Sequence, residues 1–181
     1  MIRLPAHISD FRRLQVLRDN GGIYLDTDAI VLKSFAPLLR NASFVLGRQY
    51  TGEVAVGTMA AAPHHWMLNE LLDQMCRRYD GEWVTHSIDM FTQFFERHHH
   101  THTQTHRIYD NRTFFPMTWS SPQRWIHGDH IDWDWDKTYA FHLYHSNSEP
   151  YLRQYATGQR RGPSILRKVI RQGLGHTMKD I

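Results

Sequence analysis

Two carboxylates interrupt what would otherwise be one continuous apolar β segment near the start of the chain. Ile23-Tyr24-Leu25 predicts a buried strand, Asp26-Thr27-Asp28 breaks it, and the apolar run resumes over residues 29–32. Burying an ionised carboxylate is costly unless something compensates it, so we expect this pair to lie at a strand end and face a cation. Alternate side chains of an extended chain share one side, which would let Asp26 and Asp28 approach one hard divalent ion.

The residues before this segment predict a helix over 9–19 that leads directly into it. Ser9 or Asp10 can cap the start, and Asn20-Gly21-Gly22 supplies the left-handed residues that end a helix. Apolar residues at three-residue spacing define the expected inward face. They are Ile8, Phe11, Leu14 and Leu17.

The composition places the chain among globular domains. It has 181 residues, of which 41% are hydrophobic and 13% aromatic, which is enough core material to exclude disorder. A mean hydropathy of −0.56 argues against a membrane-spanning protein. The lone Cys76 excludes an internal disulfide and a Cys-rich zinc site.

The positive charge of the chain is concentrated at its C-terminal end. Residues 152–181 carry seven Lys or Arg against one Asp, so residues 1–151 are mildly acidic although the whole chain has a net charge of +3. An acidic body without a basic stripe argues against a nucleic-acid partner. We therefore expect a folded body over 1–151 and a basic helical tail over 152–181, with Ile165, Leu166, Val169 and Ile170 on its apolar face.

The middle of the chain predicts two core helices. The first carries a regular apolar stripe that follows Pro63 and ends before Asp80-Gly81, and the second covers 87–97. We expect Cys76 on the first stripe to be a buried small hydrophobe. The stripes consist of Leu68, Leu71, Leu72, Met75, Cys76 and Tyr79 in the first helix and of Ile88, Phe91, Phe94 and Phe95 in the second.

Three further segments contain candidate strands. Residues 108–110 and 114–117 each indicate a short strand, and residues 139–146 alternate as a half-buried strand with His142 and Tyr144 on one face. A lone histidine in a strand is more often a core residue than a ligand.

Two polar segments offer alternative metal ligands. The run at 98–106 holds five His in nine residues, and we interpret it as a surface loop that can bind metal adventitiously. Carboxylates also alternate with Trp over 132–136, a pattern that fits an exposed strand better than a second metal pair.

A D-x-D alone is weak evidence, but its surroundings resemble the DXD sugar-binding region of glycosyltransferase family 32. The resemblance is closest to the alpha-1,4-galactosyltransferase and alpha-1,4-N-acetylglucosaminyltransferase type. In that family a helix with S-D-x-x-R leads into G-G-I-Y-L-D-T-D. The matching residues are Ser9, Asp10, Arg13, Gly21, Gly22, Ile23, Tyr24, Leu25, Asp26, Thr27 and Asp28.

The resemblance implies an α/β fold of the GT-A type, a nucleotide-diphospho-sugar transferase fold, lacking part of the N-terminal nucleotide-binding half. It also implies Mn²⁺ or Mg²⁺ as cofactor, with Asp28 binding the ion and Asp26 holding the ribose or the ion's water shell. Asp10 would accept hydrogen bonds from donor sugar hydroxyls, and Arg13 would add positive charge beside the sugar or phosphate. Asp28, Asp26 and Arg13 would thus be the catalytic group.

The resemblance adds candidate residues before and after the D-x-D in the sequence. Gly22 and Tyr24 would contact substrate, and His142 would serve as a metal ligand or as a diphosphate hydrogen-bond donor. The family's His-x-Trp-Asn becomes His142-Leu143-Tyr144-His145 here, so His145, which replaces the Asn, is a weaker candidate. Ser146 and Asn147 are weaker candidates as well.

The resemblance therefore predicts a retaining hexosyltransferase that moves a sugar, galactose or N-acetylglucosamine, from a UDP-sugar to a glycan or glycolipid. A truncated sugar- or partner-binding module without turnover is the alternative, and a nucleotidyl or phosphoryl transferase is a third reading of D-x-D. Membrane association would come only through a missing N-terminal anchor. The location would be the Golgi lumen in a eukaryote and the cytoplasm in a bacterium.

Overall fold

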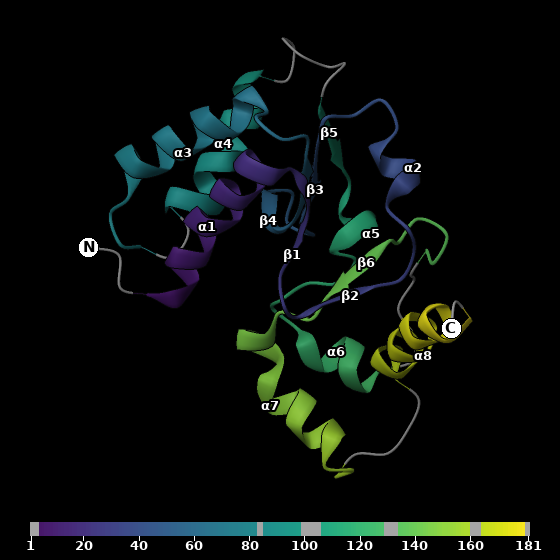
Figure 1. Cartoon of the computed structure of the whole chain (residues 1–181). Helices are drawn as coiled ribbons and strands as arrows, with labels where there is room; N and C mark the ends of the chain where they lie inside the picture. Colours follow the sequence, from purple (N-terminus) through teal and green to yellow (C-terminus); the bar gives the residue numbers. More distant parts are fainter. Residues whose placement is uncertain (1–3, 83–84, 99–105, 129–133, 160–163, 180–181) are drawn as a thin grey trace.

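The structure is a computed structural model that describes residues 4–82, 85–98, 106–128, 134–159 and 164–179. Within them the chain folds as a mixed α/β protein (Figure 1). The elements in chain order are α1 (Pro5–Asn20), β1 (Gly22–Leu25), β2 (Ala29–Val31), α2 (Ala36–Leu39), β3 (Phe44–Arg48), β4 (Val54–Ala61), α3 (Trp66–Arg78), the π-helical turn η1 (Thr85–Asp89), α4 (Met90–His98), β5 (His106–Tyr109), α5 (Asn111–Phe114), α6 (Pro122–His127), β6 (Ala140–His142), α7 (His145–Ala156) and α8 (Ile165–Lys179).

A four-stranded sheet forms the centre, in the order β1-β4-β3-β5. β4 runs antiparallel to both of its neighbours, whereas β3 and β5 are parallel. Side chains of β3 alternate between the two faces, so that Phe44 and Leu46 enter one core and Val45 enters another. The sheet therefore separates two apolar layers.

Helix α1 confirms the predicted helix but begins four residues earlier than expected. Pro5 occupies its first turn after an extended Leu4, with no side-chain cap, because the fixed φ of proline already suits a helix start. Ser9 and Asp10 consequently lie inside the helix, and the prediction that one of them caps it was wrong. The predicted end is confirmed: Gly21 has φ +66°, and its N–H donates to the carbonyl of Leu17 at 2.8 Å.

The first core lies between the sheet and the helices α1, α3 and α4, which Figure 1 shows together on one side. Leu14 and Leu17 of α1 are buried there, but Ile8 is 41% exposed, so it is not part of the inward face. Cys76 is exposed and lies outside the buried face of α3, so the prediction of a buried cysteine was wrong. The buried residues of α3 are Met67, Leu68, Leu71, Leu72 and Met75.

The interrupted apolar segment divides between two sheets. β1 joins the edge of the central sheet, where Ile23 is 46% exposed, so the predicted buried strand is an exposed edge. β2 instead pairs antiparallel with β6, with Ala29 opposite His142 and Val31 opposite Ala140. The turn that contains Asp26 and Asp28 is thus the link between the two sheets.

The structure differs from two predicted strands: the one at 114–117 is absent, and the one at 139–146 is shorter than expected. Residues 111–114 form α5, capped by Asp110, whose carboxylate accepts from the N–H of Arg112 at 3.1 Å; the strand predicted at 114–117 was wrong. β6 is buried on both faces and stops at His142, because Tyr144 adopts a left-handed φ of +50° and α7 begins at the next residue. Most of the His-rich run (99–105), and residues 132 and 133 of the acidic-aromatic segment, lie outside the described residues.

The predicted C-terminal helix is confirmed as α8. Ile165, Leu166 and Val169 are buried against Leu32 and Phe141, while the expected boundary after residue 151 falls inside α7. α8 therefore closes a third apolar cluster, which lies beside the β2–β6 sheet. Nowhere in the described part of the chain is a helix both long and apolar enough to cross a membrane.

Replacing Leu166 by Ala should lower the free energy of unfolding by about 2–4 kcal/mol, because a 2%-exposed side chain would leave a cavity between α8 and β6. Leu174→Ala on the same helix is the matched control, since Leu174 is 57% exposed and should change stability by less than about 0.5 kcal/mol. Urea unfolding followed by circular dichroism measures both. Equal effects would show that α8 is not docked as described.

Candidate functional site

A bulge in β4 places two backbone carbonyls at the site. The β3–β4 pairing passes from Leu46 opposite Met59 to Gly47 opposite Ala55, so residues 56–58 of β4 bulge away from β3. Two carbonyls of the bulge meet groups from the N-terminal segment. Gly57 O accepts from the N–H of Asp26 at 2.8 Å, and Val56 O accepts from Nη1 of Arg13 at 2.7 Å.

Asp26-Thr27-Asp28 forms a tight turn, in which the N–H of Ala29 donates to the carbonyl of Asp26 at 3.0 Å. The two carboxylates therefore do not share a side through extended geometry, as the spacing predicted. They converge because the turn places Asp28 against β6, where its carbonyl accepts from the N–H of Leu143 at 2.9 Å. The prediction of a shared face is confirmed, for a different physical reason.

His142 completes a three-residue cluster. Its Nε2 lies 3.3 Å from Oδ2 of Asp26 and 3.3 Å from Oδ1 of Asp28, and one potential ligand atom from each residue lies within 4.8 Å of the others. Nδ1 accepts from the N–H of Tyr144 at 3.1 Å, so the neutral ring carries its proton on Nε2 and donates it to the carboxylates. Of the described residues, this is the group of side chains whose geometry suits a metal ion.

A second set of contacts fixes the other oxygen of Asp26. Tyr24 donates its hydroxyl to Oδ1 at 2.7 Å, and Nη2 of Arg13 lies 3.2 Å from the same oxygen. Burial by itself would raise the pKa of Asp26, but the bond to His142, the charge of Arg13 and the bond from Tyr24 together lower it. Asp26 is therefore held as an anion with its Oδ2 turned toward the cluster.

Arg13 joins Asp26 to Asp10. Its guanidinium is only 6% exposed and lies 3.0 Å from Oδ1 of Asp10, while Nε donates to the carbonyl of Ser9 at 3.3 Å. Nε2 of His86 lies 3.4 Å from the other oxygen of Asp10. Burial raises the pKa of Asp10, offset in part by the charges of Arg13 and His86, and burial likewise lowers the pKa of His86. Arg13 thus positions two carboxylates at one surface.

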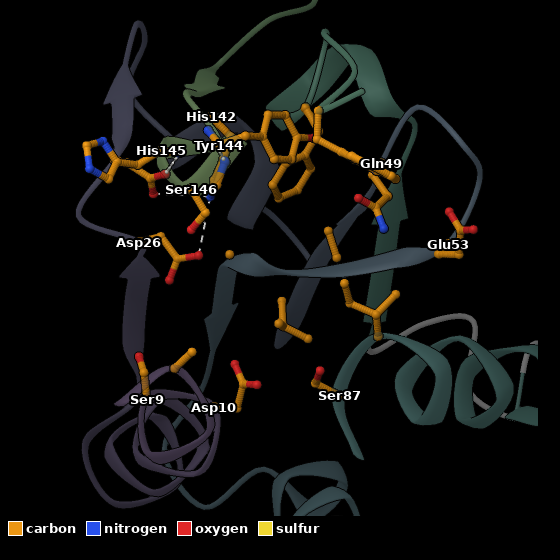
Figure 2. A pocket seen from close by; sticks show the side chains of 18 of the residues that line it. Ser9, Asp10, Asp26, Gln49, Glu53, Ser87, His142, Tyr144, His145 and Ser146 are labelled. Carbon is orange, nitrogen blue, oxygen red and sulfur yellow. Dashed lines mark hydrogen bonds and ion pairs between the residues drawn. The ribbon is translucent and has the colours of Figure 1, made fainter. Parts of the chain in front are cut away.

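These groups open into a pocket of about 700 Å³. Figure 2 shows Asp26, His142 and the first residues of α7 on one side of it. Most of the candidates from the sequence line this pocket, but Gly22 and Tyr24 do not. Gly22 instead allows the chain to turn at φ +100°, and Tyr24 supports Asp26 from behind. The candidates on the pocket wall are Asp10, Arg13, Asp26, Asp28, His142, Ser146 and Asn147.

Sequence reasoning named Ser146 and Asn147 at the start of α7 but missed Gly57, Tyr144 and the backbone N–H of His145. A Cβ on Gly57 would lie 2.7 Å from Oδ2 of Asp26 and 3.0 Å from Nε2 of His142, and an isolated glycine in a strand pattern is a signal of such close approach. The hydroxyl of Tyr144 is buried with no hydrogen-bond partner among the described residues, and burial and the nearby Asp28 raise its pKa. The first N–H of α7, from His145, donates to Oδ2 of Asp28 at 2.7 Å.

The chain is thus an α/β protein in which a carboxylate-histidine cluster that could hold a metal ion lines a pocket at the junction of two sheets. Comparison with known proteins narrows this class. Residues 1–45 match the family described as "Glycosyltransferase sugar-binding region containing DXD motif". The chain is therefore similar to this DXD-containing region over residues 1–45, which agrees with the resemblance seen in the sequence.

Two curated relatives extend the match beyond this region. The chain is 25% identical over 183 aligned positions to "Glucan organizing enzyme 1" of Cryptococcus neoformans, an alignment that covers 94% of this chain and 49% of that protein. It is 26% identical over 161 positions to "Lactosylceramide 4-alpha-galactosyltransferase" of Rattus norvegicus, covering 81% of this chain and 42% of that protein. The chain spans less than half the length of either relative, and no solved structure matches it significantly.

Replacing Gly57 by Ala should weaken Mn²⁺ binding at the cluster by about tenfold or more, because the added methyl group displaces Asp26 or His142. Gly175→Ala is a control with nothing within 4 Å of the new methyl group. Titration calorimetry with Mn²⁺ compares the two variants, and both retain the His-rich run. Unchanged Mn²⁺ affinity in Gly57→Ala would remove the cluster as the cation site.

Proposed function

We propose that this chain belongs to a divalent-cation-dependent, retaining hexosyltransferase of the GT-A fold type, which transfers a hexosyl group from a UDP-sugar to a glycan or glycolipid acceptor. The observation that carries the proposal is the convergence of Asp26, Asp28 and His142 with the Asp10–Arg13 pair on one pocket. For a eukaryotic source, the proposed compartment is the Golgi lumen. The donor is UDP-galactose or UDP-N-acetylglucosamine in this proposal.

The residues of the cluster fit Mn²⁺ or Mg²⁺. Two carboxylates supply hard oxygen ligands, an imidazole nitrogen suits Mn²⁺ better than Mg²⁺, and the missing side chain at Gly57 leaves room beside both Asp26 and His142. When bound, such an ion supplies Lewis-acid stabilisation of the departing diphosphate. Asp26 and Asp28 would hold it from the turn between the two sheets.

The start of α7 supports a diphosphate on the same side. Asp28 accepts the N–H of His145 there, and Ser146 and Asn147 line the pocket beside it. The N-terminus of a 12-residue helix carries partial positive charge and favours an anion. Ser146 and Asn147 would therefore bind diphosphate oxygens through hydroxyl, amide or backbone N–H groups.

The opposite side of the cluster would hold the donor sugar. Asp10 reaches the pocket with one oxygen fixed by Arg13, so it can accept hydrogen bonds from sugar hydroxyls. Arg13 is committed to Asp10, Asp26 and the carbonyl of Val56, and acts by positioning these groups. In the transfer, the bond from the anomeric carbon to the diphosphate oxygen breaks, the acceptor oxygen bonds to that carbon on the same face, and the acceptor proton passes to the departing diphosphate.

The second candidate is a sugar- or partner-binding module without turnover, because the same pocket and cluster could hold a ligand without transferring a sugar. The two candidates share the pocket and differ only in chemistry. Release of UDP from a UDP-sugar by the purified chain, with water as acceptor, separates them. Turnover supports the transferase, and binding without any turnover supports the module.

Asp28→Asn should weaken Mn²⁺-dependent UDP binding by at least about tenfold, because it removes one anionic ligand from the cluster. Calorimetric titration of UDP with and without Mn²⁺ measures this loss. Asp73→Asn, an equivalent change at the exposed Asp73–Arg77 pair, is the control. A UDP affinity that is independent of Mn²⁺ and of Asp28 would overturn the metal role.

The tautomer of His142 gives a separate test of its role. Ligation of a cation at Nε2 requires the ring proton to move from Nε2 to Nδ1, which breaks the hydrogen bond from the N–H of Tyr144, so Mg²⁺ binding should shift both ring ¹⁵N signals of His142. NMR of ¹⁵N-labelled protein at saturating Mg²⁺ measures this shift, and His142→Gln assigns the ring signals. Ring signals that keep the pattern of a proton on Nε2 would identify His142 as a hydrogen-bond donor to the carboxylates or the diphosphate rather than as a ligand.

A further inference from the structure

The pocket has a second wall that the cluster does not use. It consists of the turn between β3 and β4, which contributes Gln49, Thr51 and Glu53, and of Trp119 from the segment after α5. Figure 2 shows Gln49 and Glu53 on the side of the pocket away from Asp26. These residues have no role in the cation, diphosphate and donor-sugar contacts described above.

Gln49 points to a ligand most directly. The residue is only 8% exposed, it lines the pocket, and its side-chain amide has no hydrogen-bond partner among the described residues. Neither amide atom is among the fully buried unpaired atoms of the described residues, so water or a ligand in the pocket can reach the amide and bond to it. Figure 2 shows this amide turned toward the interior of the pocket.

Two backbone hydrogen bonds close the turn that carries Gln49. The backbone N–H of Gln49 donates to the carbonyl of Glu53 at 2.8 Å, and the N–H of Gly52 donates to the carbonyl of Gln49 at 2.9 Å. Thr51 donates its hydroxyl to Oε2 of Glu53, which leaves Oε1 without a hydrogen-bond partner in the part of the chain that the structure describes. The turn therefore presents the amide of Gln49 and Oε1 of Glu53 to a ligand in the pocket.

Trp119 adds an apolar surface to this polar wall. Its side chain lines the pocket and the residue is 44% exposed, so part of the ring is available to a ligand. An aromatic ring on the same wall as amide and carboxylate groups matches a pyranose, which has one apolar C–H face and a rim of hydroxyls.

The charge of the wall restricts the ligand further. Glu53 and Asp89 both line the pocket and carry negative charge, and Arg48, the basic residue of the turn, binds the carbonyl of Gly52 without lining the pocket. A carboxylated or phosphorylated sugar would meet like charge on this side. The wall therefore favours an uncharged sugar.

We propose that Trp119, Gln49 and Glu53 form the acceptor subsite, which binds an uncharged hexopyranose with its apolar face on Trp119 and neighbouring hydroxyls on Gln49 and Glu53. The inference rests on the proposed transferase function, since it places the acceptor across the pocket from the donor. A pocket of about 700 Å³ falls in the range of roughly 300–1,000 Å³ that holds ligands larger than one sugar.

The test titrates three neutral disaccharides, lactose, maltose and chitobiose, into the full chain and follows ligand signals by saturation-transfer NMR. Gln49→Met keeps the shape of the side chain and removes the amide, and Trp119→Ala removes the ring. Each should weaken the best-bound disaccharide about tenfold or more, the equivalent of about 1.4 kcal/mol. Tyr50→Ala, at a 65%-exposed residue of the same turn that does not line the pocket, should leave the affinity unchanged.

Charge selection supplies an independent readout. Sialylated lactose should bind the wild type about tenfold more weakly than lactose, and Glu53→Gln should narrow this difference, because it removes one of the two repelling charges. Wild-type protein that binds none of the three disaccharides, or variants that bind as well as wild type, would overturn the subsite. Melting curves identify any variant that fails to fold, and the remaining variants then decide.

Titration of UDP with Mn²⁺ on the same variants separates this inference from the proposed function. Gln49→Met and Trp119→Ala should keep wild-type UDP affinity if the two walls act independently. Normal UDP binding with unaltered disaccharide binding in the variants overturns the subsite alone. Loss of disaccharide binding in a chain that never binds UDP overturns the transferase and leaves a sugar-binding site.

Discussion

The buried guanidinium of Arg13 is the interaction on which the site depends. It lies between Asp10 and Asp26 and donates to the bulged carbonyl of Val56, so it ties α1, the acidic turn and β4 together. Breaking a buried ion pair of this kind costs about 3–5 kcal/mol, because the partner charges stay behind without compensation. A lysine has one compact charged group and could not reach all of these acceptors in the same plane. The helix start at Pro5 and its glycine end serve to place this one side chain.

The two-stranded β2–β6 sheet brings together the acidic turn and His142, which are far apart in the chain. β2 and β6 pair antiparallel with Ala29 opposite His142, which brings the imidazole beside Asp26 and Asp28. The start of α7 follows at once, and its first N–H binds Asp28. Gly57 in the bulge of β4 keeps this junction open, since any side chain there would collide with two of the three members. The cluster is thus a property of how the two sheets meet.

Local patterns predicted the helices better than the strands. The stripes of α3, α4 and α8 are strongly amphipathic, so their existence could be predicted, although Cys76 fell on the exposed side. β1 was expected to be buried and is an exposed edge, and residues 111–114 form a helix where a strand was expected nearby. Short apolar segments have no period of their own that fixes their environment, and their partners in the sheet decide it.

The sequence by itself determined the acidic pair that interrupts an apolar segment and its attachment to a helix that ends in two glycines, because these follow from residue types at short and fixed spacing. His142 became a candidate only through the resemblance to the family. Only the tertiary structure decided that the carboxylates converge through a turn, that Arg13 faces inward to Asp10 and Asp26, and that Tyr24 stands behind the site rather than in it. It also brought Gln49 and Trp119 to one pocket. Contacts between residues many positions apart depend on sheet register and bulges, which no local pattern encodes.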